Sequence, residues 1–274
     1  MEVLSSYSER GDGPDNEDAY GYRDNIFWVI DGATDLYHLN LFGCDDDVAR
    51  YVRQLNQCIY DNANGKDRLA DILRKSVSDT NKLLSLKTED YEIYKLPSFA
   101  VLLARMTGSK CEYYILGDCV LLVKNKGEII KLTDSRLLVF TEKNRSGIEA
   151  LKKSGKLTYE NKIELLRDTR KYMNTENGYW IGSVDCAGID NAIQGEIDID
   201  PETMCLGCSD GLMEAFDLFG ISAIDGSIFD AEKLKHIVNA LRKCQQDDAR
   251  NSVARVRKKD DLTYILVRCA YGSI

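Results

Sequence analysis

The sequence predicts an α+β fold in which strands form antiparallel hairpins and helices occur in pairs. In the middle of the chain, β-rich runs at residues 99–105, 111–116, 120–124 and 128–132 are separated only by short turns containing glycine. Such short connections are typical of antiparallel hairpins. Helical patterns follow one another instead of alternating with strands, which argues against a parallel βαβ sheet.

The first third of the chain reads as two strands followed by two helices. Residues 3–8 and 26–30 are β-rich, and the sequence GDGPD at 11–15 indicates a loop between them. Aspartates at 45–47 open the first helix, because acidic side chains favour a helix N-terminus. The apolar positions of the two helices recur at helical spacing: Val48, Tyr51, Val52, Leu55, Cys58 and Ile59 in the first, and Leu69, Ile72, Leu73, Val77, Thr80, Leu83 and Leu84 in the second.

The segment at about 134–192 is polar and irregular, and we expect it to form an insertion or lid over the sheet, with helices around 148–153 and 159–172. Strands should follow at 192–199 and 203–207, and helices near 212–216 and 231–244. The chain should end on a strand at 262–269. No repeat, low-complexity tract or linker divides the sequence, so we expect residues 1–274 to form a single domain.

Composition excludes several classes of function. The chain has 274 residues, of which 44% are hydrophobic, enough for a substantial core. Its 36 basic and 45 acidic side chains give a net charge of -9. This charge argues against binding to nucleic acid, which needs a basic face, and against docking on an anionic membrane.

The nine cysteines indicate reduced thiols in a cytoplasmic protein rather than a disulfide framework, because their number is odd and most lie in apolar runs. Cys205 and Cys208 form a C-x-x-C pattern, but no second pair or matching histidines complete a zinc site. The first residues lack the basic start and long apolar run of a signal peptide. No apolar run approaches the ~20 residues that cross a bilayer.

Acidic side chains at the ends of predicted strands are the most informative feature of the sequence. They occur at 16–18, 29–32, 208–211 and 260–263, far apart along the chain. Carboxylate oxygens are the preferred ligands of hard cations such as Mg²⁺ and Mn²⁺. The pattern therefore predicts a metal centre on a β-scaffold, and with it an enzyme.

Three of the four acidic segments also have a simpler interpretation. Asp31 ends a strand too apolar to be exposed, so its carboxylate must be paired, hydrogen-bonded or metal-bound, unless it only forms a turn. Asp210 precedes a helix and could be its N-cap. Asp260 and Asp261 precede the last strand and could form a solvated turn.

Taken in order, the motifs carry a family resemblance. They read Asn-Glu-Asp at 16–18, Asp-Gly at 31–32, Gly-Asp at 117–118, Ser-Asp-Gly at 209–211 and Asp-Asp-x-Thr at 260–263. Each motif is weak alone, but five in this order on predicted strand ends are specific. The sequence resembles a compact bacterial member of the type 2C (PPM) metal-dependent serine/threonine protein phosphatases, over nearly the whole chain.

The resemblance implies a β-sandwich of two antiparallel sheets flanked by pairs of helices, with a metal centre at one end. Asp31 would bridge two Mg²⁺ or Mn²⁺ ions, with the carbonyl oxygen of Gly32 on the first. Asp210 and Asp260 would complete the second site. Asp118, together with Asp210, would form a weaker third site.

The implied activity is hydrolysis of phosphoserine or phosphothreonine in proteins by a hydroxide that bridges the two cations. Glu17 and Asp18 would hold metal-bound waters or ligands from the outer shell. The implied catalytic set is therefore Asp31, Asp210, Asp260, Glu17 and Asp18. The implied partners are a phosphoprotein substrate and a cognate serine/threonine kinase system.

Two departures from the family pattern affect phosphate binding. Gly13 stands where the family usually has an arginine that grips the substrate phosphate. Arg10 lies in the same segment and is the candidate replacement, although it could equally face solvent. The Gly-Asp motif continues with Cys119 and Val120 instead of serine and arginine. These differences leave two alternatives open: a catalytically weak or inactive phosphatase-like binding module, and a hydrolase of small phosphate esters.

Overall fold

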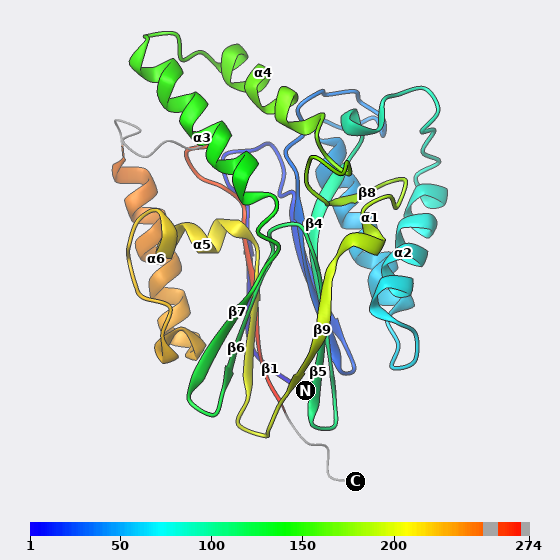
Figure 1. The fold of residues 1–274 in the computed structure, drawn as a ribbon, viewed down its shortest axis with the longest axis vertical. Helices are drawn as coiled ribbons and strands as arrows, with labels where there is room; N and C mark the ends of the chain where they lie inside the picture. Colours follow the sequence, from blue (N-terminus) through cyan, green and yellow to red (C-terminus); the bar gives the residue numbers. More distant parts are fainter. Residues whose placement is uncertain (249–256, 270–274) are drawn as a thin grey trace.

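Two antiparallel sheets pack face to face in the computed structural model, which describes residues 1–248 and 257–269 (Figure 1). The first sheet has the order β1-β11-β10-β6-β7 and the second the order β2-β3-β4-β5-β9, with β8 added beside β4. The strands are β1 (Glu2–Glu9), β2 (Asp18–Arg23), β3 (Ile26–Gly32), β4 (Ser98–Thr107), β5 (Lys110–Leu116), β6 (Val120–Asn125), β7 (Glu128–Leu132), β8 (Gly182–Ser183), β9 (Ile193–Asp198), β10 (Met204–Cys208) and β11 (Leu262–Arg268).

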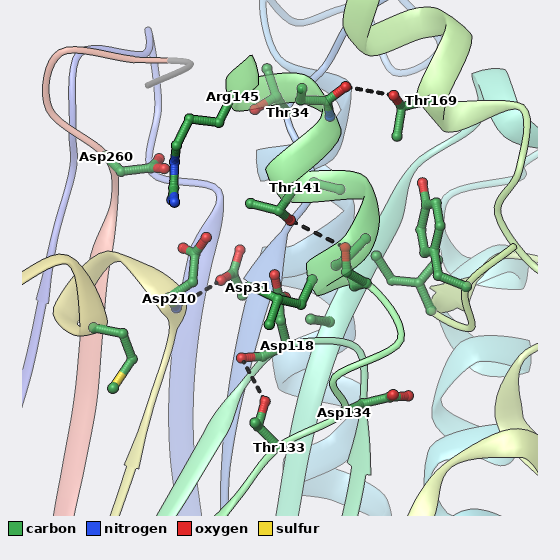
Figure 2. Close-up of a pocket in the computed structure, with 18 of the residues that line it drawn as sticks. Asp31, Thr34, Asp118, Thr133, Asp134, Thr141, Arg145, Thr169, Asp210 and Asp260 are labelled. Atoms are coloured by element: carbon green, nitrogen blue, oxygen red, sulfur yellow. Dashed lines mark hydrogen bonds between the residues drawn. The ribbon is translucent and has the colours of Figure 1, made fainter. Parts of the chain in front are cut away.

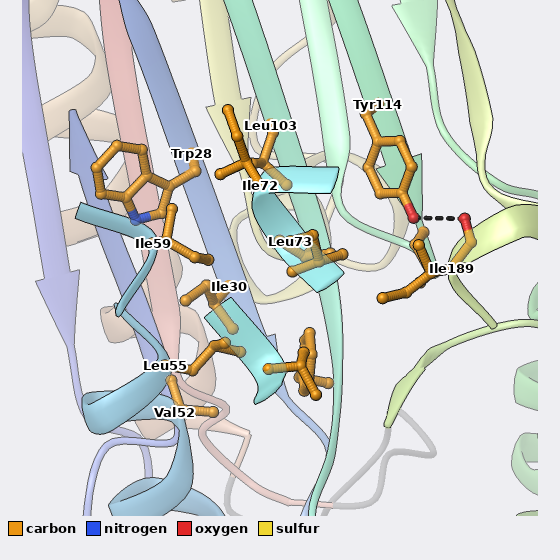
Figure 3. Close-up of a cluster of buried hydrophobic side chains, with 14 of the residues drawn as sticks. Trp28, Ile30, Val52, Leu55, Ile59, Ile72, Leu73, Leu103, Tyr114 and Ile189 are labelled. Atoms are coloured by element: carbon orange, nitrogen blue, oxygen red, sulfur yellow. Dashed lines mark hydrogen bonds between the residues drawn. The ribbon is translucent and has the colours of Figure 1, made fainter. Parts of the chain in front are cut away.

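Strand β3 shows how one apolar run serves two cores. Side chains alternate between the faces of a strand. Phe27 and Val29 therefore join the core between the two sheets, while Trp28 and Ile30 face the helices on the outer side of the second sheet (Figure 3). Burial on both faces explains why residues 26–30 are continuously apolar.

Helices cover both outer faces of the sandwich in pairs, as predicted. The second sheet packs against α1 (Asp47–Asn62) and α2 (Leu69–Leu83), and the first sheet packs against α5 (Asp210–Asp217) and α6 (Ala231–Asp247) (Figure 1). Asp46 caps α1 by accepting a hydrogen bond from the backbone N–H of Ala49 at 2.8 Å. The predicted α+β fold class is confirmed.

The third helix pair lies across one end of the sandwich and consists of α3 (Leu138–Lys153) and α4 (Tyr159–Arg170) (Figure 1). The helix predicted around 148–153 is present, but its predicted start was wrong, because α3 begins at Leu138. Two sequence signals are missing there: Leu137 makes no side-chain cap, and Ile148 is the only fully buried side chain assigned to α3. Likewise α5 begins at Asp210, before the predicted 212, and α6 extends to Asp247.

No helix in the described ranges is both long and apolar enough to span a membrane. All nine cysteines lie in these ranges and are free thiols. Cys205 and Cys208 are buried in β10, in agreement with a packing role.

Candidate metal centre

The alternation of side chains in the second sheet places two predicted site residues between the sheets. Asp31 follows Phe27 and Val29 in the same phase of β3, so its carboxylate points toward the space between the sheets. Asp18, the first residue of β2, is paired directly with Asp31 in the β2–β3 ladder. The polar residues thus lie at the end of the inter-sheet core.

The first sheet contributes polar side chains at the same end. Ser209 follows β10, and its hydroxyl donates to Asp18 Oδ2 at 2.7 Å, across the two sheets. The backbone N–H of Thr263 in turn donates to Ser209 Oγ at 3.0 Å. The serine and threonine of the two C-terminal motifs therefore connect β10 and β11 to the carboxylate of Asp18.

Helix α5 brings Asp210 to Asp31. The backbone N–H of Asp210 donates to Asp31 Oδ2 at 3.3 Å, although the two residues are 179 positions apart in sequence. Asp210 is the first helical residue, and Ser209 is the N-cap position, so the N-cap interpretation of Asp210 was wrong. Gly211 permits this arrangement, because a Cβ at that position would lie 1.8 Å from the carbonyl oxygen of Asp261.

Six aspartates line one cavity of about 400 Å³, and four of them are predicted metal ligands from separate segments. Asp31, Asp118, Asp210 and Asp260 surround its acidic end, between the sandwich and α3 (Figure 2). Gly32 also lines the cavity, and a Cβ there would lie 2.4 Å from the carbonyl oxygen of Glu17. The structure therefore brings together all five residues that the sequence assigned to metal binding.

Glu17 and Asp18 are buried and are not among the residues that line the cavity. Glu17 Oε1 accepts a hydrogen bond from the backbone N–H of Asp35 at 2.8 Å, and Glu17 Oε2 lies 2.5 Å from Nη2 of Arg257. The neighbouring Asp261 accepts from the backbone N–H groups of Gly11 and Glu17 at 2.5 and 2.7 Å. Asp261 thus fixes the N-terminal loop against the last strand.

The carboxyl groups in and next to the cavity have raised pKa values, so they favour the protonated form. Loss of solvation is the largest cause, and it raises the pKa of Asp118 to about 6 and the pKa values of Glu17 and Asp18 to about 8. The pKa values of Asp31 and Asp210 are raised well above their usual range by the same loss of solvation. Neighbouring carboxylates, including Asp210 beside Asp31, raise them further.

The donor chemistry of this cavity fits a divalent cation. Four carboxylates that repel one another gain most from an ion of opposite charge, and their oxygens are the ligands that Mg²⁺ and Mn²⁺ prefer. Across residues 1–248 and 257–269, no three acidic, histidine or cysteine side chains are already arranged as a complete ion-binding cluster. A suitable set of donors nevertheless lies in one cavity.

The structure places Arg10 away from the cavity. Arg10 is exposed, and its guanidinium donates to the carbonyl oxygen of Pro14 at 2.5 Å. The space beside Gly13 is instead occupied by Arg257, whose Nη1 would lie 3.2 Å from a Cβ at that position. This contact could not be predicted, because residues 13 and 257 are distant in sequence and neither lies in a periodic pattern.

No protein-family model and no curated protein matches this sequence. Solved structures of bacterial serine/threonine phosphatases, in contrast, share its fold. One is PstP/Ppp of Mycobacterium tuberculosis, with a TM-score of 0.57 and 15% identity over 97% of this chain and 98% of that one.

Two further structures agree with this assignment of the fold. Stp1 of Staphylococcus aureus matches with a TM-score of 0.55 and 16% identity, over 99% of this chain and 96% of that one. The PPM Ser-Thr phosphatase MsPP of Mycobacterium smegmatis matches with a TM-score of 0.53 and 16% identity, over 98% and 100% of the two chains. The sandwich implied by the sequence motifs is therefore the fold that this chain adopts.

Proposed function

We propose that this protein is a Mg²⁺- or Mn²⁺-dependent phosphatase that acts on phosphoserine and phosphothreonine in proteins. The observation that supports it best is the cavity at the end of the sandwich, where aspartates from four segments meet. The shared fold of bacterial serine/threonine phosphatases is the second support, and a structure of PstP is described as a complex with two manganese ions.

The proposal assigns roles to the residues at this end of the sandwich. Asp31, the Gly32 carbonyl, Asp210 and Asp260 would hold two ions, and Asp118 would contribute to a weaker third site. When bound, the ions would supply an acidified bridging water for attack on phosphorus and would neutralise charge on the phosphoryl oxygens.

The protein itself supplies rigidity around this centre. Hydrogen bonds from Asp210 to Asp31 and from Ser209 to Asp18 fix the two sheets relative to each other at the site. Glu17, held by Asp35 and Arg257, would orient waters from behind the carboxylates. A phosphoprotein supplied by a serine/threonine kinase in the cytoplasm would be the substrate.

Hydrolysis assays test this proposal directly. The purified protein should hydrolyse p-nitrophenyl phosphate and a phosphothreonine peptide when Mn²⁺ is present, and EDTA should abolish both activities until Mn²⁺ is added back. Hydrolysis of the small ester alone would favour an enzyme for small phosphate esters. Retention of Mn²⁺ without hydrolysis of either substrate would favour a non-catalytic binding module.

A further inference from the structure

Basic side chains that line the cavity are the candidates for binding a substrate phosphate. A phosphate dianion is repelled by the surrounding aspartates, so it requires positive charge besides any bound cation. Three basic residues of the described chain line the cavity: Lys131, Arg145 and Arg170. They differ in their present hydrogen-bond and ion-pair partners and in the shape of the charged group.

Arg170 and Lys131 are less suited than Arg145 to bind a phosphate beside the predicted metal ligands. Arg170 donates from Nη1 to Ser98 Oγ at 3.1 Å and from Nη2 to the carbonyl oxygen of Thr34 at 3.3 Å, which connects α4 to the second sheet. Lys131 of β7 lies 3.8 Å from the carboxylate of Asp217 at the end of α5. Arg170 is thus held by two hydrogen bonds. The Lys131–Asp217 pair is long and exposed (38% and 58%), so it contributes little to stability, but a lysine ammonium lacks the planar fork that matches two phosphate oxygens.

Arg145 of α3 extends from the helix toward Asp210 and Asp260 (Figure 2). Its recorded ion pair is with Glu142 on the same helix, at 2.6 Å, and the two side chains are 30% and 52% exposed. Exposed pairs of this kind contribute little to stability. The guanidinium is therefore available to a stronger partner, and its planar fork matches two oxygens of a phosphate.

The arginines near the N-terminal loop are not similarly available. Arg10 donates to the carbonyl of Pro14 on the exposed side of that loop. Arg257 lies 2.5 Å from the buried carboxylate of Glu17 and 3.8 Å from that of Asp261. Moving Arg257 to a substrate would leave the buried carboxylate of Glu17 without its counter-ion, which is costly.

We propose that Arg145 binds the phosphate group of the substrate from above the aspartates, so that the α3–α4 pair supplies the phosphate-binding arginine of this enzyme. This assignment rests on the proposed phosphatase function. It gives the insertion a defined role, because substrate phosphate would be held between the metal centre in the sandwich and one side chain on α3. A phosphomonoester has three terminal oxygens, so two could accept hydrogen bonds from the fork of Arg145 while the third faces the aspartates and their ions.

Substitution of Arg145 tests the proposal, with Glu142 as the matched control. Arg145→Ala should raise KM for a phosphothreonine peptide about 10- to 100-fold, the loss expected for a charge-assisted pair of hydrogen bonds. The affinity for inorganic phosphate, measured by calorimetry in the presence of Mn²⁺, should fall by a similar factor. Arg145→Lys should lie between wild type and Arg145→Ala, because it keeps the charge but loses the fork.

Glu142→Gln breaks the same ion pair on α3 without removing the arginine, so its KM and phosphate affinity should match those of the wild type. Equal effects of Arg145→Ala and Glu142→Gln would show that loss of the ion pair on α3 causes the change, and would overturn the assignment. Unchanged phosphate affinity in Arg145→Ala would also overturn it. A wild-type protein that binds phosphate with Mn²⁺ but hydrolyses no ester would instead contradict the phosphatase function alone.

Discussion

Asp31→Asn and Asp210→Asn should each lower kcat for phosphate ester hydrolysis by more than about 100-fold. Loss of an outer-shell partner of a metal typically costs about 10- to 100-fold, and these two carboxylates are placed to contact the ions themselves. The same variants should be at least as stable as the wild type when metal is absent. Asparagine removes a charge that the cavity disfavours, as the raised pKa of each aspartate indicates.

The control for this prediction is Asp198→Asn, which also replaces an aspartate by asparagine. Asp198 pairs with Lys110 at 2.7 Å on the exposed end of β9, where ion pairs contribute about 1 kcal/mol or less. Its kcat should be unchanged. Steady-state kinetics and thermal unfolding in EDTA provide the measurements, and full turnover by Asp31→Asn and Asp210→Asn would contradict the assignment of the metal centre.

The increase in Tm produced by Mn²⁺ should grow as the pH rises from 5.5 to 8. In the metal-free protein, the pKa of Asp18 is about 8 and that of Asp118 is about 6, against usual values near 4. Because these values are raised by folding, the folded state binds more protons than the unfolded state in this window. Their contribution to stability is therefore full below pH ~4 and is lost as the pH rises to 8.

Cations reverse this loss by binding the ionised carboxylates, and protons compete with them at low pH. We expect the Mn²⁺-induced shift at pH 8 to exceed the shift at pH 5.5 by at least about 2–4 °C, which corresponds to ~1 kcal/mol in a large domain. Scanning calorimetry with Mn²⁺ and with EDTA measures it. A shift that is independent of pH, or that persists in Asp31→Asn, would place the ions elsewhere.

The sequence predicted the acidic end of the sandwich because strand ends carry strong local signals. The apolar run before Asp31 and the run before Ser209 identify buried strands, and alternation fixes which side chains point between the sheets. The hydrogen bond between Asp210 and Asp31 could not be predicted in the same way. It depends on how β10 and β3 lie across the sandwich from each other, which no local pattern encodes.

The positions of the basic side chains were harder to predict than those of the acidic ones. Arg145 lies on a helix whose first half has neither a cap nor a wide apolar face, so the segment read as irregular. Arg257 reaches Glu17 because residues 257–261 lie against the N-terminal loop. The sequence-based choice of Arg10 relied on proximity along the chain, and the structure shows its side chain directed to Pro14.

Anomalous diffraction from crystals soaked in Mn²⁺ is the most direct test of the central claim, that separate strand ends assemble one binding site for divalent ions. We expect two strong manganese peaks within ~2.3 Å of oxygens from Asp31, Asp210 and Asp260. A weaker third peak should lie beside Asp118. Manganese bound only at surface carboxylates such as Asp198, with none in the cavity, would contradict the claim.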